Sequence, residues 1–138
     1  VYKLSARRIG HGLNLLDAPH TLRAIADRGI GIELCPYANF QIKGFNPMPG
    51  KESQDYPLIP YLEKGILATV NVDNLGISAA NHSDNLLLLP KISAGVTRLD
   101  VLRLLRNAVE LCFLPVGEKP KLRQRIEQSL AKLFTKNH

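Results

Sequence analysis

The order of its apolar and helical segments constrains the fold of this chain more than any other feature. Three short apolar segments of strand length lie at residues 7–9, 31–34 and 66–70. Two stretches with helical spacing separate them, at residues 17–29 and 56–64. Alternation of strands and helices is typical of βαβ units, in which the strands run parallel. The sequence therefore predicts an α/β fold built on a parallel sheet.

Cap and turn residues support the predicted helices. We expect Asp17 to cap the first helix and Gly29 to end it. The second helix tolerates its prolines because both fall in its first turn, and Gly65 follows its last residue. Further along the chain, Thr97 and Asp100 resemble the capping pair of a later helix. Each helix therefore carries a local signal for where it begins or ends.

The second half of the chain is expected to be helical. Residues 85–94 are mostly apolar and fit a helix that Pro90 interrupts, and stronger helical patterns cover residues 97–114 and 121–134. Four residues make the apolar stripe of the helix at 97–114: Leu102, Leu105, Val109 and Cys112. No linker rich in Gly or Ser separates the two halves, so we expect residues 1–138 to belong to one domain.

Composition and charge indicate whether the chain is expected to bind nucleic acid or to enter a membrane. The net charge is +6, and much of the excess lies in residues 119–136, where basic and apolar positions alternate. This pattern indicates a solvated helix face rather than a nucleic-acid surface. The longest apolar run, residues 86–89, is too short to span a membrane. Cys35 and Cys112 lack the spacing of a metal or disulfide motif, which predicts free thiols and a reducing, cytoplasmic compartment.

Polar residues follow each predicted strand at the point where the strand ends. His11 follows the first strand between two glycines, Cys35 follows the second, and Asp73 and Asn74 follow the third. The carboxyl ends of parallel strands meet on one side of a sheet, where α/β proteins bind their ligands. This placement is the pattern of a ligand site on that side.

Each of these residues also has a purely structural interpretation. His11 fits a turn between glycines, and Cys35 fits a small buried apolar residue. Asp73 fits the N-cap of a helix that begins near Leu75. A buried, unpaired carboxylate is costly, so Asp73 must be solvated, hydrogen-bonded or bound to a cation.

Four motifs along the chain are specific in combination. "RRIGHGLNL", "IELCPYAN", "VNVDN" and "NAVELCFLPVGEKPKL" occur in this order from residue 7 to residue 122. In sequence and spacing they resemble the C-terminal half of the adenosine/AMP deaminase family, within the amidohydrolase superfamily. The resemblance implies the C-terminal part of a TIM (β/α)8 barrel, namely its last three strands, followed by C-terminal helices. Residues 1–138 would then be the C-terminal portion of a barrel domain.

The resemblance also implies a chemistry. Members of this family use Zn²⁺ to deaminate an adenine-type purine, such as adenosine or an adenine nucleotide, by hydrolysis. Asp73 matches the aspartate that binds the metal and contacts the attacking water, and His11 matches the histidine that orients this water. Asn74 stands where the family has a second aspartate, which contacts the imidazole edge of the purine. Three other residues match the segment beside the site and are assigned no chemistry: Cys35, Pro36 and Asn39.

Two departures from the family pattern shape these expectations. The family's other metal-binding histidines and its catalytic glutamate lie upstream of the matched region, so this chain carries one of the four protein ligands. A catalytic zinc site needs about three protein ligands, and His20, His82 and His138 are not expected to replace the missing ones. We therefore expect a chain that is inactive alone and needs an N-terminal barrel half or a homo-oligomer partner.

The second departure is Asn74 in place of an aspartate. An amide can donate a hydrogen bond to a neutral purine nitrogen, whereas an ionised carboxylate can only accept one. Purine binding is compatible with this change, while substrate preference is expected to differ, as in a divergent member. The alternative is a catalytically inactive deaminase-like scaffold or interaction domain.

Overall fold

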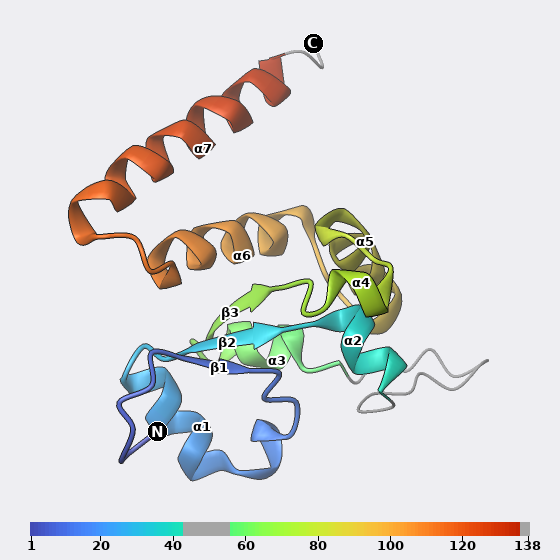
Figure 1. Cartoon of the computed structure of the whole chain (residues 1–138), viewed down its shortest axis with the longest axis vertical. Coiled ribbons are helices and arrows are strands. Elements are labelled where there is room, and N and C mark those ends of the chain that lie inside the picture. Colours follow the sequence, from blue (N-terminus) through green and yellow to red (C-terminus); the bar gives the residue numbers. More distant parts are fainter. Residues whose placement is uncertain (43–55, 136–138) are drawn as a thin grey trace.

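A parallel three-stranded sheet lies at the centre of the computed structural model, which describes residues 1–42 and 56–135 (Figure 1). Its strands are β1 (Arg8–Gly10), β2 (Gly31–Leu34) and β3 (Leu67–Val70), in the order β1-β2-β3. Both pairings are parallel. The predicted α/β fold with a parallel sheet is confirmed, and each strand begins within one residue of its predicted start.

Helices connect the strands and cover the sheet (Figure 1). Helix α1 (Pro19–Asp27) joins β1 to β2, α3 (Leu58–Glu63) precedes β3, and α6 (Arg98–Leu111) packs against β3. At the carboxyl ends of the strands lie α2 (Pro36–Gln41), α4 (Leu75–Ser78) and α5 (His82–Ile92). The last helix is α7 (Lys119–Thr135). The described residues also include two short 3-10 turns: Leu15–Asp17 and Val116–Glu118.

The two faces of the sheet differ in polarity. Ile9, Ile32 and Ala68 share one register row, and their side chains belong to a core to which α1 and α3 also contribute. Alternate positions face the other way and include Arg8 and Glu33, whose guanidinium and carboxylate groups lie 2.8 Å apart. Gly31 shares the register row of Arg8, and the C-terminal end of α6 packs on this second face.

Helix α6 approaches the sheet closely at its C-terminal end. A Cβ atom on Gly31 would lie 2.3 Å from Leu111 Cδ1, so glycine is needed there for Leu111 to pack against β2. The Asn107 side chain donates a hydrogen bond to the Ala68 carbonyl oxygen at 2.8 Å. The predicted capping pair is present, because the Thr97 and Asp100 side chains each bond the other's backbone nitrogen. The Thr97 hydroxyl hydrogen bond lowers the pKa of Asp100.

The apolar stripe predicted for α6 is wrong in part. The residues that α6 buries are Asp100, Leu104, Asn107, Val109 and Leu111. Leu102 and Leu105 instead line a groove between α6 and α7, together with Ile126 and Leu130 of α7. The helix has two apolar sides, one toward the sheet and one toward α7, and periodicity alone does not assign them to their partners.

Helix starts show two further differences. Asp17 does not cap α1: it belongs to a 3-10 turn, and Ala18 precedes the helix without a side-chain cap. Helix α5 starts at His82, earlier than predicted, because Asn81 and Asp84 form a capping box, and Pro90 lies inside it. Helix α2 was not expected, since six residues are too few to show a helical period.

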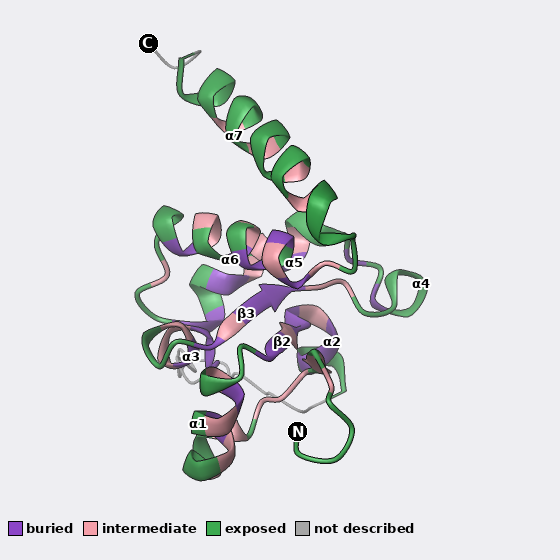
Figure 2. Ribbon diagram, turned by 90° about the vertical axis from the view of Figure 1, so that its left-hand side faces the viewer, coloured by how far each residue is buried: buried purple, intermediate pink, exposed green. Residues whose placement is uncertain are grey.

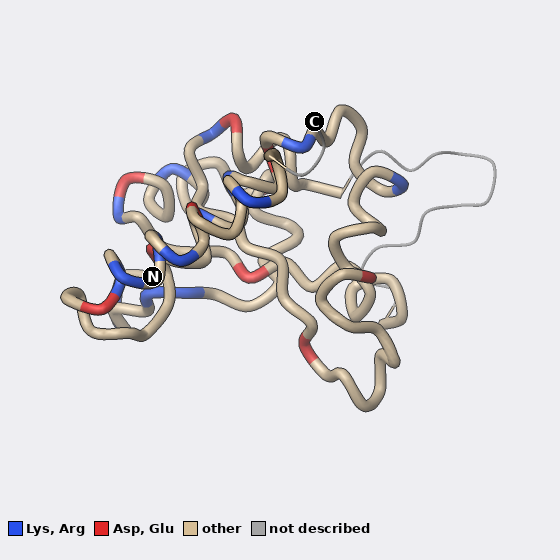
Figure 3. The backbone as a smooth tube through the Cα atoms, turned by 90° about the horizontal axis from the view of Figure 1, so that it is seen from above, with Lys and Arg blue, Asp and Glu red and all other residues tan. Residues whose placement is uncertain are grey.

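Helix α7 projects away from the sheet, and none of its residues is buried (Figure 2). The helix carries five basic residues and one acidic residue, Glu127. Figure 3 marks basic residues in blue and acidic residues in red along the chain. Lys121 lies 2.9 Å from the Glu118 carboxylate, and Arg123 pairs with Glu110 of α6. The charges of this helix are thus partly paired, as on a solvated helix face. His138 lies outside the described residues.

Candidate functional site

The loop after β1 holds His11 in a defined position. The His11 backbone nitrogen donates to the Glu33 carbonyl oxygen at 2.9 Å, which extends the β1–β2 ladder by one residue. The Tyr61 hydroxyl then anchors the loop, 2.5 Å from the Gly12 carbonyl oxygen and 3.0 Å from that of Leu13. Burial raises the pKa of Tyr61, so the phenol keeps its proton for these contacts.

The loop after β3 presents Asp73. The Asn71 backbone nitrogen donates to the Leu34 carbonyl oxygen at 2.8 Å, continuing the β2–β3 ladder past the strand. The Thr69 hydroxyl donates to Asn71 Oδ1 at 2.9 Å. Asp73 follows two residues later, where the chain turns away from the sheet.

His11 and Asp73 share an uncommon backbone conformation. Their φ angles are +60° and +63°, in the left-handed region. Few residues other than glycine adopt this region, although His and Asp enter it more readily than most. Such residues concentrate at functional sites, where the surrounding structure offsets the strain. Ser5 and Ala79 also have positive φ angles, so this conformation accompanies both predicted site residues without being confined to them.

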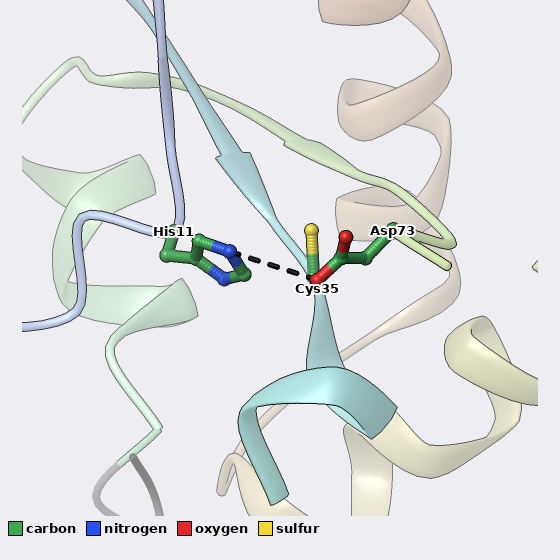
Figure 4. A group of neighbouring side chains, drawn as sticks. All are labelled: His11, Cys35 and Asp73. Carbon is green, nitrogen blue, oxygen red and sulfur yellow. Dashed lines mark ion pairs between the residues drawn. The ribbon is translucent and has the colours of Figure 1, made fainter. Parts of the chain in front are cut away.

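The structure brings the ends of the three strands together. His11 Nε2 lies 3.6 Å from Asp73 Oδ2, although β1 and β3 are not neighbours in the sheet (Figure 4). Cys35 Sγ, from the end of β2, lies within 4.8 Å of both ligand atoms. The side chains of His11 and Asp73 are 41% and 40% exposed, so a ligand can reach them. The convergence that the topology made possible is present in the structure.

The side chains of His11, Cys35 and Asp73 carry the kinds of ligand atom that bind zinc. Imidazole nitrogen, carboxylate oxygen and thiolate sulfur are the ligands that Zn²⁺ takes in proteins. Within the described residues, His11, Cys35 and Asp73 are the group of three whose ligand atoms lie close enough to share one ion. His20 and His82 are exposed on α1 and α5 and do not belong to this group. The three ligand atoms therefore lie close enough together to surround a single ion.

Of the three residues, Cys35 is the least suited to binding a metal ion. Burial, and then the charges of Asp73 and Glu33, raise the pKa of its thiol to about 11. Its sulfur lies 3.5 Å from the Glu33 carbonyl oxygen, the position of a weak S–H hydrogen bond. A metal binds the thiolate and not the thiol. Cys35 therefore agrees with the interpretation as a small buried residue, and both cysteines are free.

This pKa predicts slow alkylation of Cys35. At pH 8 we expect iodoacetamide to label Cys35 in the folded protein roughly 10²-fold more slowly than an unperturbed thiol, because the thiolate is scarce. The labelling rate should rise as the pH increases toward 11. Peptide mass spectrometry measures it, with the half-buried Cys112 and the urea-unfolded chain as references. Equal rates for Cys35 in the folded and unfolded chains would contradict the assignment.

Asn74 caps a helix, whereas the N-cap interpretation of Asp73 is wrong. Asn74 Oδ1 accepts a hydrogen bond from the Ile77 backbone nitrogen at 3.1 Å, at the start of α4. Asp73 precedes the cap and leaves its carboxylate for His11. Asn74 therefore commits its side-chain oxygen to the helix, and its amide nitrogen is the atom that remains to contact a ligand.

Sequence reasoning missed two residues beside His11. Asn39 of α2 is fully buried, with its Nδ2 atom 2.8 Å from His11 Nδ1. The Tyr56 hydroxyl, also fully buried, donates to Asn39 Oδ1 at 2.9 Å. The motif match pointed to Asn39 without a role, and Tyr56 carried no signal except its place at the start of a predicted helix.

Comparison with known proteins identifies the family. The family model for adenosine deaminase matches residues 1–129. The adenosine deaminase of Shewanella loihica is 31% identical over 122 residues, which cover 88% of this chain and 35% of the relative. That of Clostridium botulinum is 30% identical over 125 residues, covering 91% and 36%. The chain thus spans about a third of the length of these curated relatives.

Solved structures agree in fold. An adenine deaminase from Arthrobacter aurescens superposes with a TM-score of 0.78 at 19% identity, covering 91% of this chain and 36% of that one. An amidohydrolase from Burkholderia ambifaria with bound Zn also gives 0.78 at 19% identity, covering 94% and 35%. At these identities the likeness shows the fold alone. Taken with the match over residues 1–129, it leads to one conclusion: this chain belongs to the adenosine deaminase family.

Proposed function

We propose that the complete protein is a zinc-dependent hydrolase that deaminates an adenine-type purine, adenosine or an adenine nucleotide, to the inosine-type product. The observation that carries the proposal is the pairing of His11 Nε2 with Asp73 Oδ2 at 3.6 Å. These two groups come from separate strands, in strained conformations, on the side of a parallel sheet where ligands bind. The family match supplies the reaction class.

The proposal also covers the fold of the complete protein. We place β1, β2 and β3 as the last three strands of a TIM (β/α)8 barrel, with α6 and α7 as its C-terminal helices. Support comes from the sequential order of the parallel strands and from the coverage of about a third of each structural neighbour. The N-terminal barrel half would supply the remaining metal ligands and the catalytic acid.

Each residue has a separate role in this proposal. Asp73 would hold the metal, which when bound supplies Lewis-acid activation of water. His11 would direct the attacking water toward the purine ring and stabilise charge that develops on its oxygen. Water adds to the ring carbon that bears the amino group, and ammonia leaves. Asn74 would donate a hydrogen bond from its amide nitrogen to the purine's imidazole edge, since its oxygen caps α4.

The test is a deamination assay on the complete polypeptide with Zn²⁺. Ammonia release from adenosine, AMP and ATP would be followed in parallel with the zinc content of the protein. Release from any of the three is the expected result, and the preferred substrate identifies the class. A protein that binds no zinc and releases no ammonia would instead be the alternative, a catalytically inactive deaminase-like scaffold.

A further inference from the structure

Asn39 lies between a buried hydroxyl and the imidazole of His11. It is 0% exposed and sits in the first turn of the short helix α2. Its Oδ1 atom lies 3.3 Å from the Cys35 backbone nitrogen and 2.9 Å from the Tyr56 hydroxyl. Its Nδ2 atom lies 2.8 Å from His11 Nδ1. The amide thus connects two groups that are 17 residues and 28 residues away in sequence.

The orientation of this amide follows from its neighbours. The Cys35 N–H can only donate, so the Asn39 atom facing it must be the oxygen. A flipped amide would place an NH₂ group against that N–H, which leaves two buried donors facing each other. The Tyr56 hydroxyl reinforces the assignment, because burial raises its pKa and it stays protonated as a donor to the same oxygen. Asn39 therefore presents its NH₂ group to His11.

Tyr56 is itself held in place. Its backbone nitrogen donates to the Ile92 carbonyl oxygen at 3.3 Å, and the Ser93 hydroxyl donates to its carbonyl oxygen at 3.2 Å. Both partners lie at the C-terminal end of α5. The hydroxyl that orients Asn39 is thus fixed by an element distinct from those that carry His11 and Asp73.

The protonation of the histidine ring follows. An NH₂ group at 2.8 Å donates to His11 Nδ1, so Nδ1 carries the lone pair. A neutral imidazole with an unprotonated Nδ1 carries its proton on Nε2. Nε2 is the atom that faces Asp73 Oδ2 at 3.6 Å. The imidazole N–H is therefore directed to the place where the carboxylate and the reacting water meet.

We propose that Tyr56 and Asn39 are positioning residues that hold His11 as the Nε2–H tautomer, with its N–H aimed at Asp73 and the attacking water. This inference rests on the proposed function for the identity of the water. A donor fixed in this direction stabilises charge that develops on an oxygen in front of it. Neither residue would touch the substrate, and each acts through the orientation of His11.

The test is the ¹⁵N spectrum of the histidine side chains in the complete protein. Long-range ¹H–¹⁵N correlation distinguishes a protonated ring nitrogen from an unprotonated one, and His11→Asn identifies the His11 signals by their loss. The expected spectrum shows Nε2 protonated and Nδ1 unprotonated. A protonated Nδ1 in the unaltered protein would overturn the proposal.

Asn39→Asp tests the relay directly. The aspartate has the same shape, but its carboxylate can only accept a hydrogen bond, so a proton must appear on His11 Nδ1. We also expect kcat to fall about 10- to 100-fold with little change in KM, as for other groups that orient a reacting side chain. A folded variant whose Nδ1 stays unprotonated would overturn the proposal.

Tyr56→Phe tests the outer residue and provides a second readout should Asn39→Asp fold poorly. It removes one of two donors to Asn39 Oδ1, and we expect the two ring nitrogens to shift toward a mixture of tautomers. Unchanged resonances would overturn the role of Tyr56. Tyr61→Phe is the matched control, because Tyr61 is equally buried and contacts the carbonyls after His11 but not its ring. It is expected to leave Nε2 protonated.

These spectra separate the two proposals. If the unaltered protein shows the expected tautomer and Asn39→Asp reverses it, but no purine is deaminated, the tautomer assignment stands and the proposed function fails. If deamination is present while Asn39→Asp leaves both the spectrum and kcat unchanged, the function stands and the positioning role fails.

Discussion

Replacing Asp73 with alanine is expected to reduce deamination by the complete protein at least about 10³-fold and to lower its zinc content. The carboxylate is proposed both to bind the metal and to contact the attacking water, so its loss removes two interactions at once. Enzyme assay and elemental analysis on the same preparation measure the two effects. Asp73→Asn should be tested beside it, because asparagine tolerates the left-handed backbone at φ +63° better than alanine does.

The controls for this prediction separate metal loss from unfolding. Asp17→Ala removes an exposed carboxylate from the 3-10 turn before α1 and should leave both activity and zinc content unchanged. Circular dichroism and thermal unfolding establish that the Asp73 variants remain folded. Activity that survives in a folded Asp73→Asn protein would remove this residue from the metal site.

Replacing His11 with asparagine is expected to lower kcat by about 10²- to 10³-fold while the protein keeps its zinc. The imidazole is proposed to direct the water and to stabilise charge on it without binding the metal, so activity and metal content should separate here, unlike at Asp73. Asparagine is preferred to alanine because it tolerates φ +60°. Steady-state kinetics and zinc analysis provide the comparison.

His20→Asn is the matched control, since His20 is exposed on α1 and lies outside the cluster at the strand ends. It should behave as the unaltered protein. Loss of zinc in His11→Asn would make His11 a metal ligand rather than a group that orients water. If neither Asp73 nor His11 variants change any activity, the proposed catalytic site is excluded.

The contrast between the two variants also bears on the scaffold alternative. A deaminase-like scaffold would tolerate both changes without effect on assembly, because neither side chain belongs to the core.

Local sequence determined most of the secondary structure. The predicted strand at 31–34 coincides with β2, and the Thr97–Asp100 capping box starts α6 as expected. These features depend on residues at most a few positions apart, so a single sequence contains the information. The placement of polar residues after each strand is local in the same sense, and it put His11, Cys35 and Asp73 on the same side of the predicted sheet.

Only the tertiary structure decided which side chains meet and which atoms they use. Asn39 contacts His11 across a gap of 28 residues, and Tyr56 contacts Asn39 across a gap of 17 residues. These contacts depend on the packing of α2 and on the anchoring of Tyr56 on α5. Asn74, and not Asp73, is the N-cap of α4. An N-cap residue typically has an extended backbone, whereas Asp73 has a left-handed one. Likewise, the positions of the sheet and of α7 determine which apolar residues of α6 face each of them. Periodicity and motifs specify what each segment can become, whereas contacts between distant segments depend on the whole packed core.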